Sequence, residues 1–216
     1  MTKDEKIAKL GKVITDRATV LLGKDKITPD SPEYLGINSA LKFTAVKYDE
    51  KMADDILDIA LTMKKRVPLT IEQLAKKNPQ FDRAYLEKAL QALSESGLVE
   101  FHWENLDGKN PNHEKRWVLD MFVPGSAEIM MINPEQSDMF PETADFFERM
   151  AYLPLAGITE MVPPGGAGIG MHVIPVEKAI PAESKSLPIE HLSHWLKKYE
   201  GHIGVSVCSC RKQQRI

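Results

Sequence analysis

The stretch from Met52 to Phe122 constrains the fold of this chain most strongly, because helical and strand patterns follow one another in it in a fixed order. From 52 to 63, apolar residues recur at intervals of three and four, which is typical of the buried face of an α-helix. These residues are Met52, Ile56, Ile59, Ala60 and Met63. Pro68 cannot continue a helix, so we expect the first helix to end before it.

Start and stop signals define two further helices. Thr70 and Gln73 have the spacing of a capping box, in which two side chains three residues apart bind the free N–H groups at a helix start. They predict a second helix from 71 to about 77. Asp82 is the expected N-cap of a third helix, and Gly97 the glycine that ends it. The apolar stripe of this third helix consists of Leu86, Ala89, Leu90 and Leu93.

Two β-rich runs, 98–103 and 116–122, flank a polar, turn-rich segment at 105–115 and predict a β-hairpin. Three helices followed by a hairpin resemble the winged-helix domains of bacterial regulators over about seventy positions. The match is clearest in Thr-Ile-Glu-Gln-Leu-Ala-Lys at 70–76 and in Leu-Glu-Lys-Ala-Leu-Gln-Ala-Leu-Ser-Glu-Ser-Gly-Leu-Val-Glu at 86–100. We therefore expect an α+β fold that is mainly helical, with a winged-helix unit and a small irregular second unit.

These patterns suggest three regions: an N-terminal helix and strap at 1–49, the winged-helix-like domain at 50–124, and an irregular α/β segment at 125–216. In the first region, 4–22 has the apolar spacing of an amphipathic helix. The segment 24–48 reads as a connector that contains a short helix from 39 to 44.

The third region is less regular. The pattern at 126–133 fits a short helix or a strand and does not decide between them. A helix is expected at 188–199, with Pro188 in its first turn. A short β-like run at 202–207 leads to the cysteines.

The charge and hydropathy of the sequence indicate its cellular compartment and exclude some classes of partner. The net charge is −3, so the whole chain has no general attraction to nucleic acid or to an anionic membrane. No apolar run approaches the roughly 18 residues of a membrane span. The first six residues lack the apolar core of a signal peptide, and two cysteines do not make a disulfide framework. We therefore expect a cytoplasmic protein without a membrane partner.

The third helix would read bases if this domain bound DNA. Residues 51–123 carry 11 Lys and Arg against 12 Asp and Glu, a net charge of −1. DNA affinity depends largely on neutralising phosphates, so this balance favours a packing or docking module over a duplex reader. The polar residues of the expected outer face are Asp82, Arg83, Glu87, Lys88, Gln91, Ser94 and Glu95.

Two other motifs do not predict a site. The glycine-rich run 163–170 is followed by a strand-like segment instead of a helix start, so it fits a loop better than a phosphate site. His191 and His194 lie three residues apart, which differs from the zinc signature of two histidines four apart, and we expect a solvated helix face.

Cys208, Cys210 and Arg211 form the sharpest chemical signal in the chain. Thiolates bind soft metals and iron–sulfur clusters, and a disulfide across one intervening residue would be strained. Arg211 could lower the pKa of the thiols and offset the charge of a cluster. A [4Fe–4S] cluster usually needs four cysteines, and this chain supplies two, so a simple pair of thiols remains the alternative.

The residues around this motif carry a second resemblance. Val-Ile-Pro-Val-Glu-Lys-Ala-Ile-Pro at 173–181, the Pro-Ile-Glu-His-Leu start at 188–192 and Gly-Val-Ser-Val-Cys-Ser-Cys-Arg-Lys at 204–212 are similar to a region of anaerobic iron–sulfur oxidoreductases. In that family a helical and winged-helix region precedes a Cys-x-Cys-Arg segment, further cysteines, ferredoxin-type clusters and often a flavin and pyridine-nucleotide domain.

The resemblance implies that Cys208 and Cys210 are the first two metal ligands of a [4Fe–4S] cluster, with Arg211 beside it. The motif is cut at Ile216, so we expect the remaining ligands beyond it. FAD and NAD(P), and the catalytic chemistry of the enzyme, would belong to parts outside these residues. The implied partners are other domains or subunits of a redox complex.

The sequence thus predicts the N-terminal scaffold or docking region of an iron–sulfur electron-transfer oxidoreductase. The alternative is a winged-helix transcriptional regulator whose cysteines sense redox state or metal. A third hypothesis is a protein-docking domain without chemistry of its own.

Overall fold

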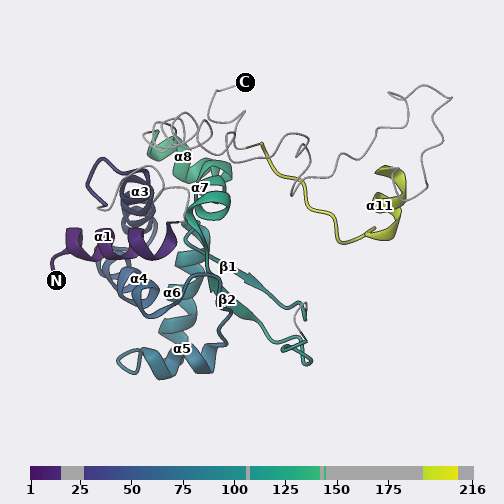
Figure 1. Cartoon of the computed structure of the whole chain (residues 1–216), viewed down its shortest axis with the longest axis horizontal. Helices are drawn as coiled ribbons and strands as arrows, with labels where there is room; N and C mark the ends of the chain where they lie inside the picture. Colours follow the sequence, from purple (N-terminus) through teal and green to yellow (C-terminus); the bar gives the residue numbers. More distant parts are fainter. Residues whose placement is uncertain (16–26, 106–107, 142–143, 145–191, 209–216) are drawn as a thin grey trace, which may run out of the picture. The chain divides into compact units, whose positions relative to one another are not determined.

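The computed structural model describes residues 1–15, 27–105, 108–141, 144 and 192–208. Within these residues the protein is mainly helical, with a small antiparallel sheet (Figure 1). The elements are α1 (Lys3–Ile14), α3 (Pro32–Lys47), α4 (Glu50–Thr62), α5 (Ile71–Lys77), α6 (Arg83–Glu95), β1 (Val99–His102), β2 (Arg116–Leu119), the π-helical turn η1 (Phe122–Ser126), α7 (Ala127–Ile132), α8 (Pro134–Met139) and α11 (Leu192–Lys198).

The three helices expected between 52 and 97 are present as α4, α5 and α6, and their predicted caps are confirmed. Thr70 and Gln73 form the capping box of α5, with each side chain accepting from the other's backbone N–H. Asp82 accepts from the backbone N–H of Tyr85 at the start of α6. Gly97 follows α6 with φ of 81°, a left-handed conformation that favours glycine.

The predicted hairpin is also confirmed. Strands β1 and β2 pair antiparallel, with Val99 opposite Leu119 and Phe101 opposite Trp117. The chain before α5 adds to this sheet, because Leu69 exchanges both backbone hydrogen bonds with Trp117 at 2.9 Å. In Figure 1 the two strands project from the helices, so the hairpin presents its outer part away from the core.

Helix α3 differs from the expected connector with a short helix at 39–44. It spans sixteen residues, most of which are buried, and Pro32 occupies its first turn. Because its buried residues are spread around most of the helix and include polar ones such as Ser39 and Thr44, α3 lacks the one-sided pattern by which amphipathic helices are recognised. The same burial makes it a central element of the core.

The apolar core is continuous from Ile7 in α1 to Met131 in α7. Residues from before position 49, from 50–124 and from after position 124 all contribute to this core. Helix α4 packs against α1, α3 and α6. Gly36 in α3 makes a close contact possible, because a Cβ atom there would lie 2.7 Å from the ring of Phe122. Phe122, the first residue of η1, is thereby in direct contact with α3.

Several expected boundaries change at the ends of the chain. Helix α1 ends at Ile14 with Thr15 as its C-cap, and the rest of the expected 4–22 helix lies outside the described residues. The undecided segment 126–133 is helical, as α7. The glycine-rich run 163–170, the segment 173–181 and His191 also lie outside the described residues.

The described elements fall in two compact units, α1 to α8 in one and α11 in the other. In α11, Trp195 stacks on Tyr199 with ring centroids 6.1 Å apart, and His194 is exposed. The segment 202–207, expected to be β-like, forms neither helix nor strand. A strand needs a hydrogen-bonding neighbour, and no described residue pairs with this segment.

Replacement of Gly36 by alanine tests the contact between α3 and Phe122. We expect the free energy of unfolding to fall by about 1–3 kcal/mol, because the added methyl must displace the ring. Urea unfolding followed by circular dichroism measures it. Gly204→Ala is the control, since nothing lies within 4 Å of a Cβ there, and should change stability by less than about 0.5 kcal/mol. Equal values for both variants would contradict the packing argument.

Candidate functional site

The predicted cluster ligands fall only partly within the described residues. Cys208 is exposed and follows the irregular segment 202–207. Cys210 and Arg211 lie outside the described residues. Within the described ranges, no three His, Cys, Asp or Glu residues are grouped so as to hold a metal ion.

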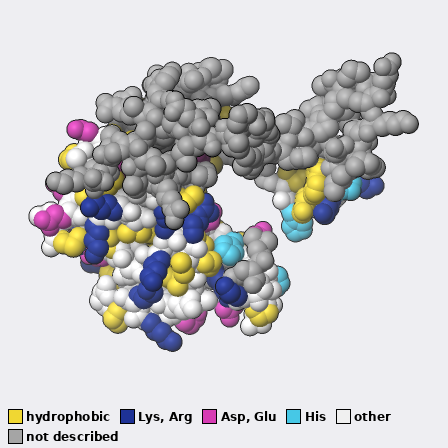
Figure 2. All heavy atoms as spheres, viewed as in Figure 1, with side chains coloured by type: hydrophobic (Ala, Val, Ile, Leu, Met, Phe, Trp, Pro, Cys, Tyr) yellow, Lys and Arg dark blue, Asp and Glu magenta, His cyan; other side chains and the backbone are white. Residues whose placement is uncertain are grey.

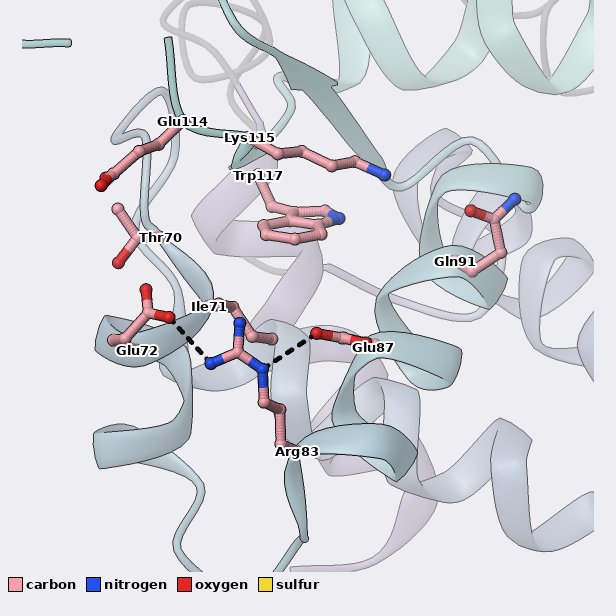
Figure 3. Close-up of a pocket in the computed structure, with 9 residues that line it drawn as sticks. All are labelled: Thr70, Ile71, Glu72, Arg83, Glu87, Gln91, Glu114, Lys115 and Trp117. Atoms are coloured by element: carbon pink, nitrogen blue, oxygen red, sulfur yellow. Dashed lines mark hydrogen bonds and ion pairs between the residues drawn. The ribbon is translucent and has the colours of Figure 1, made fainter. Parts of the chain in front are cut away.

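A cavity lies where α5, α6 and β2 meet, and Figure 3 shows its lining. Its volume is about 560 Å³, which is within the range of small-molecule and side-chain pockets. The lining residues are Thr70, Ile71, Glu72, Arg83, Glu87, Gln91, Glu114, Lys115 and Trp117. The cavity therefore joins the two capped helix starts to the hairpin.

Arg83 sits between two carboxylates at one side of this cavity. Its guanidinium donates to Glu72 at 2.9 Å and to Glu87 at 3.1 Å (Figure 3). These hydrogen bonds, first the one donated to Glu72, raise the pKa of Arg83. The pKa of Glu72 is lowered, chiefly by a hydrogen bond from its own backbone N–H and then by Arg83. Arg83 and Glu72 therefore both remain charged at neutral pH.

An aromatic cluster with a lysine at its centre forms the opposite side. The Nζ atom of Lys115 lies 3.9 Å from the ring centroid of Phe101, 5.1 Å from that of Trp117 and 5.8 Å from that of Trp103. Cations are attracted to aromatic faces at such distances. Trp103 is 51% exposed and Phe101 37%, so the cluster presents apolar surface beside the cavity.

Asn110 organises the tip of the hairpin, which the sequence predicted only as a polar turn. Its buried side chain donates to the backbone carbonyls of Trp103 and Glu114 at 3.2 and 2.9 Å. It also accepts from the N–H of Glu114 at 3.0 Å. One side chain thus replaces the ladder bonds that the two strands lose beyond His102, and it fixes the positions of the residues around the cavity.

Replacement of Asn110 by alanine should loosen this tip. We expect a loss of about 1–3 kcal/mol in unfolding free energy, because several buried backbone groups lose their partner. Hydrogen exchange should locate the effect, with the N–H of Glu114 exchanging faster. Asn112→Ala, at an exposed position of the same loop, is the control. A tip that exchanges alike in both variants would show that Asn110 does not hold it.

Asp120, at the end of the hairpin, is the most perturbed acid of the described residues. Its side chain is 2% exposed. The pKa of Asp120 is raised to about 6, mainly by burial and then by the negative charge of the nearby Glu100. Arg66, in a left-handed conformation with φ of 60°, approaches it at 3.5 Å and opposes the shift. The carboxyl group therefore takes up a proton in mildly acidic solution.

The raised pKa of Asp120 predicts a pH-dependent stability. The folded state binds the proton more tightly than the unfolded state, so this group's contribution is fully favourable below about pH 4 and is lost as the pH rises through 6. Asp120→Asn, which resembles the protonated form, should gain about 1–3 kcal/mol over the parent at pH 8 and little at pH 4. Denaturant melts across this range measure the difference. The exposed control Glu104→Gln should show no such trend. A gain in stability for Asp120→Asn that did not change with pH would disprove the predicted role of the Asp120 pKa.

The polar residues on the outer face of α6 are largely engaged within the protein. Besides Arg83, the amide of Gln91 donates to Glu95 at 3.0 Å, and Glu95 also accepts from the hydroxyl of Tyr48 at 2.7 Å. Lys88 lies over the ring of Tyr48 at 5.6 Å. On the face shown in Figure 2, side chains of both charges occur. The outer face of α6 therefore has few uncommitted hydrogen-bond donors that could bind base edges or phosphates.

The chain matches no protein-family model, no curated protein and no solved structure. Among the described residues, none of the helices combines the length and the apolar content that crossing a bilayer requires.

The sequence pattern does not predict the cavity, although it gives several of the lining residues other roles. Arg83, Glu87 and Gln91 belong to the expected outer face of the third helix, and Thr70 is the expected cap of the second. The alternation of Lys115 and Trp117 on one hairpin face is the signal that could have added the other side, because residues two apart in a strand share a face.

Proposed function

We propose that this chain is the N-terminal scaffold and docking region of a cytoplasmic iron–sulfur electron-transfer oxidoreductase. Residues 50–124 would form a winged helix that binds protein instead of DNA. The observation that carries the docking role is the pairing of Arg83 in α6 with Glu72 of α5 and Glu87 of α6. A helix that reads DNA needs such side chains free to reach bases and phosphates.

The order α4, α5, α6, β1, β2 supports the winged-helix assignment. The backbone pairing of Leu69 with Trp117 adds a third, short strand position beside β2, which is expected when the segment before the second helix joins the hairpin. The cavity then lies between the hairpin and the helix that would be the recognition helix.

The Cys-x-Cys-Arg motif supports the redox role, together with its similarity to anaerobic iron–sulfur oxidoreductases. Cys208 and Cys210 would supply two thiolates, and Arg211 a compensating positive charge. A bound [4Fe–4S] cluster would supply one-electron transfer. The contribution of this chain would be to present the two thiols, with the remaining ligands supplied by other cysteines of the redox protein.

Anaerobic reconstitution of the full natural polypeptide with iron and sulfide tests the redox role. We expect broad visible absorbance and iron bound in proportion to sulfide. Cys208→Ser and Cys210→Ser should each lower bound iron by half or more, because a lost thiolate leaves a cluster site incomplete. Ser206→Ala, two residues before Cys208, is the control. A polypeptide that stays colourless would remove the cluster from the proposal.

The element order alone also fits the rival, a winged-helix regulator with a cysteine-based sensor. Fluorescence anisotropy with duplex DNA at 50 and 200 mM salt separates the two. We expect no tight binding and no steep salt dependence, because residues 51–123 carry a net charge of −1. Submicromolar, strongly salt-dependent binding would favour the regulator.

A further inference from the structure

We infer that the base of the hairpin is a hinge whose opening is controlled by a proton on Asp120. The hinge lies where β2 ends and the π-helical turn η1 begins. In Figure 1 the two strands project from the helices, so an opening at this base would move the whole hairpin. The inference goes beyond the proposed function, because such a hinge would act whichever partner the protein binds.

Backbone hydrogen bonds close the base on both edges of β2. The N–H of Arg66 donates to the carbonyl of Leu119 at 2.9 Å, and the N–H of Asp120 donates to the carbonyl of Leu98 at 3.2 Å. Both bonds lie at or next to Asp120 in the chain or across the sheet. A movement of the hairpin about this point would therefore break them, and their N–H groups report on it.

The side chain of Asp120 is enclosed at this junction. It is 2% exposed, and a Cβ atom added to Gly125 of η1 would lie 2.8 Å from its carboxyl carbon. The carboxyl group therefore packs directly against the backbone of the π-helical turn. A carboxylate confined in this way loses hydration, so its ionised form depends on compensation from the groups around it.

The surrounding charges compensate that ionised form poorly. The guanidinium of Arg66 approaches Asp120 at 3.5 Å, but it is shared with Glu100 of β1, which it approaches at 3.6 Å. Burial first and then Glu100 raise the pKa of Asp120, Arg66 opposes the shift, and Glu128 of α7 adds to it. Among the described residues that act on this site, three carboxylates thus share one guanidinium, and ionisation of Asp120 adds repulsion between them.

The turn η1 carries two signs of strain, which make it suited to act as the hinge. Gly125 has φ of 150°, a conformation that favours glycine. The hydroxyl of Ser126 is buried and has no hydrogen-bond partner among the described residues, so hydration in an open state would recover free energy that the closed turn lacks. Turns of this π type often lie at functional sites.

The proton on Asp120 decides between the two states. In the closed state the raised pKa of about 6 keeps the carboxyl group mostly neutral at pH 5 and mostly ionised at pH 8. An open base hydrates the carboxylate, so opening becomes more favourable as the pH rises through 6. The hairpin carries the exposed rings of Phe101 and Trp103, and the proton would therefore set how freely this aromatic surface moves.

Hydrogen exchange of the full chain at pH 5 and pH 8, corrected for the intrinsic exchange rates, tests the hinge. We expect the opening constant of the Arg66 N–H to rise about tenfold over this range, because opening lets Asp120 lose its proton more readily. Asp120→Asn should abolish the rise. Glu100→Gln should make it smaller, because one of the repelling carboxylates is removed.

Glu104→Gln is the matched control, because it neutralises an exposed carboxylate on the same hairpin and should keep the full rise. The N–H of Ile59, in the core helix α4, reports unfolding of the whole protein. At pH 8 the opening constant of the Arg66 N–H should exceed that of Ile59 by about tenfold or more. Equal constants would show that only global unfolding breaks the base, and a rise that persisted in Asp120→Asn would show that another group controls it. Either result would overturn the inference.

Discussion

Burial of the apolar face of α4 is the interaction on which the described structure depends. Met52, Ile56 and Ile59 are almost fully buried, and α4 packs against α1, α3 and α6 at once. Buried side chains of this size each contribute about 1.5–3 kcal/mol through removal of apolar surface from water. The other helices can keep their polar faces in solvent because this one helix gives them a common surface to cover.

Local signals predicted much of the region from 50 to 122. The capping box of Thr70 and the left-handed Gly97 act through neighbouring backbone groups, so their effect is readable over a few residues. Helix α3 could not be read in this way, because it is buried on most sides and so has no polar face to set a period. Its sixteen residues become helical as part of the core, through contacts far apart in the sequence.

In the candidate site, too, features set by neighbouring residues could be predicted and features set by distant contacts could not. The cysteine motif could be singled out from sequence because its chemistry resides in adjacent residues. The cavity could not, because it exists only when β2 is brought against the starts of two helices. Asp120 is a similar case: nothing near it in the sequence announces burial, and burial at the end of the hairpin is the main cause of its raised pKa, with Glu100 adding to the shift and Arg66 opposing it.

The contact of Phe122 with Gly36 has a mechanical consequence. This phenylalanine follows the end of β2 at Leu119 by three residues, and its ring lies against α3 at Gly36, which has no side chain. A partner that tilted the two strands would therefore press directly on the longest of the N-terminal helices, with no compliant side chain between them to absorb the movement. A displacement of the two strands would therefore reach the core through the contact of Phe122 with Gly36.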